Sequence, residues 1–224
     1  MKYFIYTFIL CLLSSFSSDL LGQKVGKFGS SIQKKIGPKK IRVLYTDIIS
    51  YLGYAEPGSE DAVVGDKKFT YLYLWIPAVA PEIGIRMVSP ADGKKIKDAV
   101  KASNYDANSS TKEFFDTYIT LEKSDILSLE EISTAKIESA NWVKLEYNDD
   151  TSELPKKPDG KKYNSLLRYQ SEAGNPLKAL SVGLYRVGFT TFKRGEVKGT
   201  FLAQIGSPVK LPGVIITRDI EELK

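Results

Sequence analysis

Alternating hydrophobic and polar positions are the clearest structural signal in this chain. They are most regular over residues 184–206, where Tyr185, Val187 and Phe189 alternate with polar or small residues and the alternation resumes at Val197. Because successive side chains of a strand point to opposite faces, this segment predicts a β-hairpin with one buried face. A hairpin alone is marginal in water, so the segment is expected to lie in a larger sheet.

Further short strands are predicted along the rest of the chain. Residues 69–76 (FTYLYLWI) are apolar or aromatic on both faces, which predicts a central strand covered on both sides. Ser128 followed by Glu131 has capping-box spacing and predicts a short helix to about Lys136. The other predicted strands span residues 41–45, 48–54, 83–88, 114–121, 142–147, 163–169 and 214–217. Together they predict an all-β fold with minor α content, as a single-domain antiparallel β-sandwich.

Residues 1–22 differ in character from the rest of the chain. Lys2 is followed by an apolar run, then Ser-rich residues and Gly22, which is the order of a secretory signal peptide, and the run is too short to span a membrane. We therefore expect export. Cys11, the one cysteine, has apolar neighbours instead of a preceding small residue, which argues against lipid attachment there. The exported chain would hold together without a disulfide.

Residues 23–40 form a basic segment between the signal peptide and a predicted domain over residues 41–224. A mobile, solvated arm is the first interpretation. A contact for anionic surfaces, such as lipopolysaccharide or sulfated glycans, is the second. Nucleic acid is not an expected partner of an exported protein. The segment has no acidic residue and carries Lys24, Lys27, Lys34, Lys35, Lys39 and Lys40.

The chain contains no histidine, and its net charge is +5. This excludes Ser-His-Asp and Cys-His nucleophile systems and zinc sites that depend on imidazole. We therefore expect no enzymatic activity. Asp116 with Glu146, or Asp149 with Glu153, could be read as a glycosidase acid–base pair, but sequence spacing does not establish the separation that such a pair needs.

Tyr71, Tyr73 and Trp75 alternate along one predicted strand and allow two interpretations. Exposed aromatic rings could form a sugar-stacking platform, which would make the protein a carbohydrate-binding module. Aromatic residues at alternating strand positions more often cover the sheet or fill the core.

Residues 148–162 form the longest stretch without periodicity, and a loop of this length is usually functional or disordered. Asp149 and Asp150 are adjacent carboxylates within it. Calcium takes oxygen ligands from carboxylates, hydroxyls and carbonyls, and acidic loops often supply them. A solvated turn is the alternative interpretation, because no DxDxDG calcium loop is present.

Several runs of sequence resemble the spirochaetal surface-lipoprotein family, which includes the major surface lipoprotein of pathogenic Leptospira. They occur in the same order and with similar spacing over residues 47–222, and they include YLYLWIPAV (71–79), GIRMVSP (84–90), FDT (115–117), KYNSL (162–166), GLYR (183–186), FTTF (189–192) and GEVKG (195–199). The resemblance implies a jelly-roll β-sandwich on the outer-membrane surface, without known catalysis. It also implies calcium (Ca2+) binding and adhesion to extracellular-matrix proteins. A purely structural envelope protein, without either ligand, is a further alternative.

The resemblance also implies which residues hold the calcium ion. By position they are Asp116, Thr117, Asp149, Asp150 and the backbone carbonyl of Tyr163. The acidic run of the family is shortened here to residues 148–150, which implies a weaker site. The family continues beyond the position of Lys224 into an amphipathic helical segment associated with partner binding.

Overall fold

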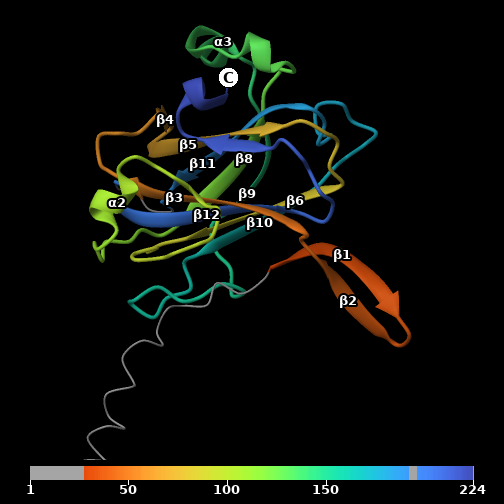
Figure 1. Cartoon of the computed structure of the whole chain (residues 1–224), viewed down its shortest axis with the longest axis horizontal. Coiled ribbons are helices and arrows are strands. Elements are labelled where there is room, and N and C mark those ends of the chain that lie inside the picture. Colours follow the sequence, from red (N-terminus) through yellow and green to blue (C-terminus); the bar gives the residue numbers. More distant parts are fainter. Residues whose placement is uncertain (1–27, 192–195, 224) are drawn as a thin grey trace, which may run out of the picture.

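The computed structural model describes residues 28–191 and 196–223. The predicted signal peptide, Cys11 and residues 23–27 of the basic segment lie outside these ranges. Strands dominate the described chain and gather in two layers (Figure 1). None of the described helices is long and apolar enough to cross a membrane.

The layers are two β-sheets. The first, in the order β10-β6-β12-β3-β7, contains β3 (Asp47–Ala55), β6 (Glu82–Val88), β7 (Val100–Lys101), β10 (Ser165–Gln170) and β12 (Gly199–Ser207). The second, in the order β13-β5-β11-β8-β9 with β4 beside β5, contains β4 (Ala62–Val64), β5 (Lys67–Ile76), β8 (Tyr118–Lys123), β9 (Val143–Asn148), β11 (Gly183–Thr190) and β13 (Ile215–Thr217). Neighbours are antiparallel, except that β3 and β7 run parallel.

Apolar side chains from both sheets meet in one core. Leu72 and Leu74 of β5 belong to the same buried cluster as Ile85 of β6. The rings of Phe189 in β11 and Phe201 in β12 lie 4.6 Å apart and join the two layers. Two sheets whose inner faces share a core form a β-sandwich. The predicted all-β fold is therefore confirmed.

The predicted pairing of residues 184–206 as a hairpin is wrong. β11 pairs with β5 and β8, whereas β12 pairs with β3 and β6, so the two strands lie in different sheets. Nearly all residues of both strands are buried, so both faces are covered rather than one. Alternation located the strands but could not choose their partners.

The outer face of the second sheet has its own hydrophobic cover. Tyr71, Tyr73 and Trp75 are only 4%, 8% and 5% exposed, because they pack against Ile137 and Leu223. The interpretation as sheet cover is therefore correct, and these rings cannot form the sugar platform of a carbohydrate-binding module.

The helix predicted from Ser128 to Lys136 occurs as two short pieces that contribute to this cover. They are a 3-10 turn, η2 (Leu129–Glu131), and α3 (Thr134–Ser139). Ser133 caps α3, because its hydroxyl accepts a hydrogen bond from the backbone N–H of Lys136 at 3.2 Å. The remaining described helices are α2 (Tyr105–Asn108) and η3 (Ile220–Leu223).

The described part of the expected mobile arm over residues 23–40 is ordered instead. β1 (Gly29–Ile36) and β2 (Lys39–Leu44) form an antiparallel hairpin. Gly37 has a φ of 59°, and a glycine at the first turn position is typical of two-residue hairpin loops. The dense lysines suggested a solvated arm, but the isoleucines between them and the turn at Gly37 favour paired strands.

Tyr45 follows this hairpin, and its ring lies in a slot on the first sheet. Gly84 of β6 and Gly206 of β12 are register partners beneath it. A Cβ added at Gly84 would lie 2.3 Å from the Tyr45 hydroxyl oxygen, and one at Gly206 would lie 2.8 Å from the ring. The two glycines are therefore the positions that admit the ring.

We expect Gly84→Ala to lower the melting temperature, because the new methyl group forces the Tyr45 ring out of its slot. Overpacking of this kind costs about 1–3 kcal/mol. Gly174→Ala is the matched control, since a Cβ there meets no atom within 4 Å. Equal melting temperatures for the two variants in thermal denaturation would contradict the slot.

Candidate functional site

The predicted calcium ligands lie where the β8–β9 pair ends. Ile119 in β8 is the register partner of Asn148 in β9. Because the strands are antiparallel, the residues just before β8 lie beside those just after β9. This register brings together residues 116–117 and residues 149–150, which are far apart in the sequence. We call this end of the strand pair the acidic corner.

Hydrogen bonds join a third segment to the acidic corner. The backbone N–H and the hydroxyl of Thr117 both lie 3.2 Å from the carbonyl oxygen of Tyr163. The Ser165 hydroxyl lies 2.9 Å from the Thr117 hydroxyl and donates to the carbonyl of Asp149 at 2.7 Å. Thr117 and Ser165 are fully buried, so these contacts hold the three segments in place. Sequence reasoning did not identify Ser165.

Negative charge accumulates in the acidic corner. Burial raises the pKa of Asp116 to about 6, and repulsion from Asp150 and Asp149 adds to the shift, while Lys157 opposes it. Burial also raises the pKa of Asp150, with a further contribution from Asp149. The carboxylates are therefore only partly compensated by positive charge from the protein.

Lys157 is a second residue of the corner that sequence reasoning missed. Its side chain is buried although it is charged, and its ammonium lies 4.7 Å from the centre of the Tyr163 ring and 5.1 Å from that of Phe114. Cation–π contacts of this length stabilise a partly desolvated ammonium. The loop over residues 148–162 contains four lysines, and nothing in the sequence marks Lys157 as the buried one.

The oxygen donors of the acidic corner match calcium in kind, because the ion binds carboxylates, hydroxyls and backbone carbonyls. Thr117 and the Tyr163 carbonyl are held in place by the contacts above. Asp149 is half-buried and Asp150 is exposed, and in the described part of the chain no three carboxylates converge on one point. Thr117 and the Tyr163 carbonyl are thus fixed in position, whereas the carboxylates of Asp149 and Asp150 would have to turn toward them to complete a site.

The glycosidase-type pairs find no support in the geometry. Glu153 forms ion pairs with Arg168 at 2.7 Å and with Arg42 at 2.9 Å, and its hydrogen bond with Arg168 helps hold its pKa below the usual value. A carboxylate held in this way is a poor general acid. Glu146 accepts a hydrogen bond from the backbone N–H of its neighbour Tyr147 at 3.0 Å, on an exposed part of β9.

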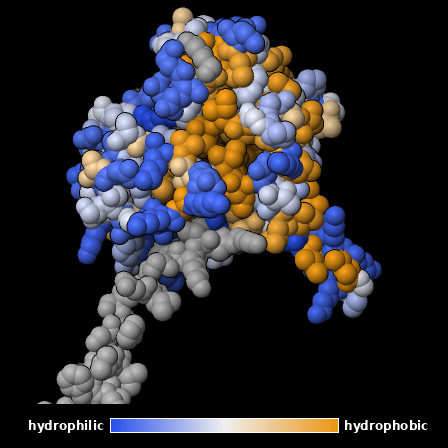
Figure 2. All heavy atoms as spheres, in the orientation of Figure 1, coloured by the Kyte–Doolittle hydropathy of each residue, from blue (hydrophilic) through white to orange (hydrophobic). Residues whose placement is uncertain are grey.

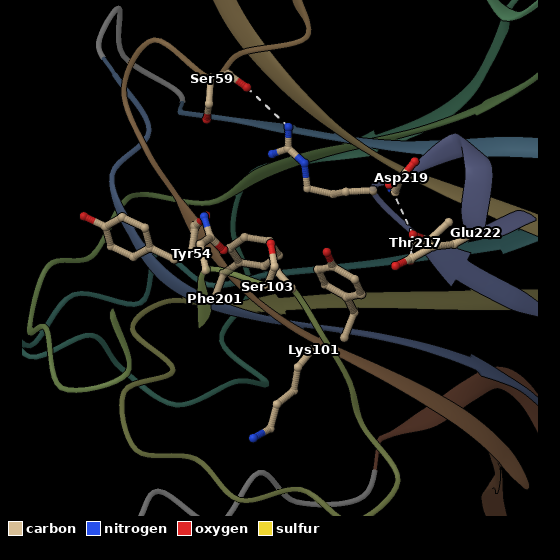
Figure 3. Close-up of a pocket in the computed structure, with 13 residues that line it drawn as sticks. Tyr54, Ser59, Lys101, Ser103, Phe201, Thr217, Asp219 and Glu222 are labelled. Atoms are coloured by element: carbon tan, nitrogen blue, oxygen red, sulfur yellow. Dashed lines mark hydrogen bonds between the residues drawn. The ribbon is translucent and has the colours of Figure 1, made fainter. Parts of the chain in front are cut away.

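A cavity of about 360 Å³ opens at another edge of the sandwich, between β7 and the segment around η3 (Figure 3). Tyr51 and Phe201 stack 6.2 Å apart on its wall, and burial raises the pKa of Tyr51 to about 12. The Arg218 guanidinium is already bonded to the carbonyl of Ser59 and to Asp61. None of the predicted ligand residues lines this cavity.

Comparison with known protein families identifies a family that matches most of the chain. Residues 39–216 match the Lipl32 family, which is described as a surface lipoprotein of the Spirochaetales order. Apart from the last residue of β13, this range includes both sheets of the sandwich, and it includes the whole acidic corner. No curated protein matches the chain at a significant level.

We expect Asp116→Asn to flatten the pH dependence of stability. The Asp116 pKa is about 6 in the folded protein, against about 4 in an unfolded chain. Because the folded pKa is raised, protonated Asp116 favours the folded state, and this stabilisation is lost as the pH rises from about 4 through about 6. The asparagine variant should therefore melt at a higher temperature than the parent at pH 7 and at a similar one at pH 4.

The measurement is thermal denaturation in EDTA across this pH range. Asp98→Asn is the control, because it makes the same change at a side chain that is 84% exposed. Coincident pH profiles for parent and Asp116→Asn would show that Asp116 titrates normally.

Proposed function

This chain belongs to the spirochaetal surface-lipoprotein family, and from that premise we propose that it is a non-enzymatic surface protein that binds calcium at the acidic corner. Family membership implies export to the outer-membrane surface. Calcium is the cation proposed because all the available ligands are oxygen atoms and the described chain has no histidine or cysteine ligand to favour a softer metal.

The meeting of the three ligand segments at the end of the β8–β9 pair, held by the Thr117 and Ser165 hydrogen bonds, is the observation that carries the proposal, and the charge in the corner supports it. A half-buried carboxyl beside Asp149 and Asp150 is destabilised in its charged form, and Lys157 compensates for this only in part. A divalent cation would remove the repulsion between the carboxylates and favour their charged forms. A cation bound at the acidic corner would therefore stabilise the folded protein.

Five groups would hold the ion. Thr117 and the Tyr163 carbonyl are part of the buried hydrogen-bonded framework, so their positions cost little to organise. Asp149 and Asp150 lie where the strand pair ends and the long loop begins, which leaves their side chains free to turn toward Asp116. The ion would thereby fasten the start of the loop to the sheet.

Adhesion to extracellular-matrix proteins remains a proposal based on the family resemblance. Display on the outer-membrane surface would make such contacts accessible. Of the expected properties, calcium binding is the one that the geometry supports best.

We expect added Ca²⁺ to raise the melting temperature of the exported protein at neutral pH. A ligand that binds only the folded state stabilises it by about 2.7 kcal/mol at one hundred times its dissociation constant. Asp149→Asn combined with Asp150→Asn should abolish the shift. Isothermal calorimetry measures binding, and differential scanning calorimetry measures the stabilisation.

Asp159→Asn is the matched control for this experiment. Asp159 lies in the same loop but accepts a hydrogen bond from the backbone N–H of Lys161, outside the acidic corner. It should keep the full calcium response. A thermal shift of the same size in the Asp149/Asp150 double variant, or no binding heat for the parent, would overturn the proposed site.

We expect Lys157→Gln to strengthen calcium binding. The lysine ammonium lowers the pKa of Asp116 and so already supplies part of the positive charge that the carboxylates attract. Removing it increases the attraction for a cation by Coulomb's law. Calorimetric titration should give a smaller dissociation constant than for the parent, whereas Lys162→Gln, which changes an exposed lysine of the same loop, should leave it unchanged. Weaker binding in Lys157→Gln would place the ion elsewhere.

A further inference from the structure

The β1–β2 hairpin belongs to neither sheet of the sandwich. Its two strands pair only with each other in the described chain. Its tip projects from the body on the side away from α3 (Figure 1). An isolated two-stranded hairpin is marginally stable in water, so a projecting one needs support at its base.

That support comes from buried polar contacts. Glu82, which is fully buried in β6, accepts hydrogen bonds from the backbone N–H of Ser31 at 2.9 Å and from the Tyr45 hydroxyl at 2.5 Å. Arg168 donates to the carbonyl of Gly29 at 2.8 Å. Because Ser31 lies in β1 and Tyr45 directly follows β2, both ends of the hairpin are held at its base while its tip stays clear of the body.

The register of the hairpin divides its tip into two faces. Residues opposite each other in an antiparallel pair point to the same side. Lys35 is paired with Lys40 and Gln33 with Arg42, which makes one face polar and cationic. The other face alternates cations with large apolar side chains, since Lys34 is paired with Ile41 and Ile36 with Lys39.

The apolar side chains of this second face are unusually exposed. Ile36 is 63% exposed and Ile41 is 48% exposed. Figure 2 shows apolar side chains of the hairpin flanked by hydrophilic ones. In the part of the chain that the structure describes, no ion pair joins Lys34, Lys35, Lys39 or Lys40 to an acidic side chain. The tip therefore presents uncovered apolar surface together with uncompensated positive charge.

The combination of exposed apolar surface and positive charge indicates which partner the tip of the hairpin can bind. A second copy of the chain, docked by two-fold symmetry through the same patch, would bring lysines against lysines. A membrane surface has no such conflict, because isoleucine side chains can enter the interface while lysine stems extend to the lipid phosphates. The family is displayed on the outer membrane, so such a surface is adjacent to the protein.

We infer that the β1–β2 hairpin docks on the anionic lipid headgroups of the membrane that displays the protein. Ile36 and Ile41 enter the headgroup region, and the four lysines contact phosphate groups. All four lie within a few residues of the tip, so their charges act together within one Debye length of about 8–10 Å. The contact orients the sandwich relative to the membrane and supplements any other attachment, since stable anchoring generally takes two weak signals.

The test is co-sedimentation of the exported protein with lipid vesicles in EDTA, which keeps the result independent of the calcium site. Each lysine near an anionic surface contributes about fivefold to membrane partitioning.

We expect binding to mixed phosphatidylcholine–phosphatidylglycerol vesicles to exceed binding to phosphatidylcholine alone and to fall as the salt concentration rises. Lys35→Gln with Lys40→Gln should weaken binding to the anionic vesicles by about tenfold or more, and Ile36→Ser with Ile41→Ser should weaken it by about tenfold.

Matched control variants on the sandwich test whether the loss of vesicle binding is specific to the hairpin or follows from any loss of charge or apolar surface. Lys95→Gln with Lys97→Gln removes the same charge from exposed positions, and Val63→Ser with Val79→Ser removes apolar side chains that are 69% and 70% exposed. Both controls should bind vesicles as the parent does. All four double variants should keep the parent melting temperature, because the changed side chains are exposed.

Three results would overturn the inference. They are equal binding of the parent to neutral and anionic vesicles, equal loss in hairpin and body variants, and a parent dimer that Ile36→Ser with Ile41→Ser converts to monomer without affecting vesicle binding. The last result, measured by light scattering, would assign the tip to a second copy of the chain.

Discussion

Glu82 is a fully buried carboxylate, and its oxygens are hydrogen-bonded by groups that lie at opposite ends of one segment. Ser31 approaches from the start of the β1–β2 hairpin and Tyr45 from just beyond its end. Leaving a buried charge without its partners costs about 3–5 kcal/mol. Both contacts are therefore maintained together, and one side chain determines where the hairpin leaves the body. Burial and this carboxylate raise the pKa of Tyr45 well above its usual value, so its hydroxyl remains a donor.

Two arginines also connect the base of the hairpin to the long loop after β9. Arg168 in β10 holds the carbonyl of Gly29 and also pairs with Glu153, which in turn pairs with Arg42 on β2. An exposed ion pair contributes little by itself, but here one carboxylate is shared between two guanidinium groups in a network. The base of the hairpin and the loop that carries Asp149 are thus fixed to the same strand of the first sheet.

Local pattern predicted much of the fold and part of the site. The apolar run at 69–76 correctly indicated a strand covered on both sides, because a strand buried on both faces is apolar at consecutive positions. The sequence does not show which strands pair with each other in the same way. The alternation in 184–206 is equally compatible with a hairpin and with two strands in opposite sheets. The ligand segments were assigned by resemblance, and the β8–β9 register explains why they meet. Lys157 was missed because a buried ammonium over Tyr163 depends on tertiary packing that no local pattern encodes.

The loop over residues 149–163 shows how a segment without periodicity can still be ordered. Leu154 packs with Phe28 and Tyr45 beside the hairpin, and the carbonyl of Pro155 accepts a hydrogen bond from Asn164. Because Leu154 is buried, the middle of the loop is held by the same desolvation that stabilises the core. The acidic residues precede this attachment and keep freedom of their side chains. A cation bound there would act on a short stretch between two fixed points, the end of β9 and Leu154, so ordering it would cost little conformational entropy.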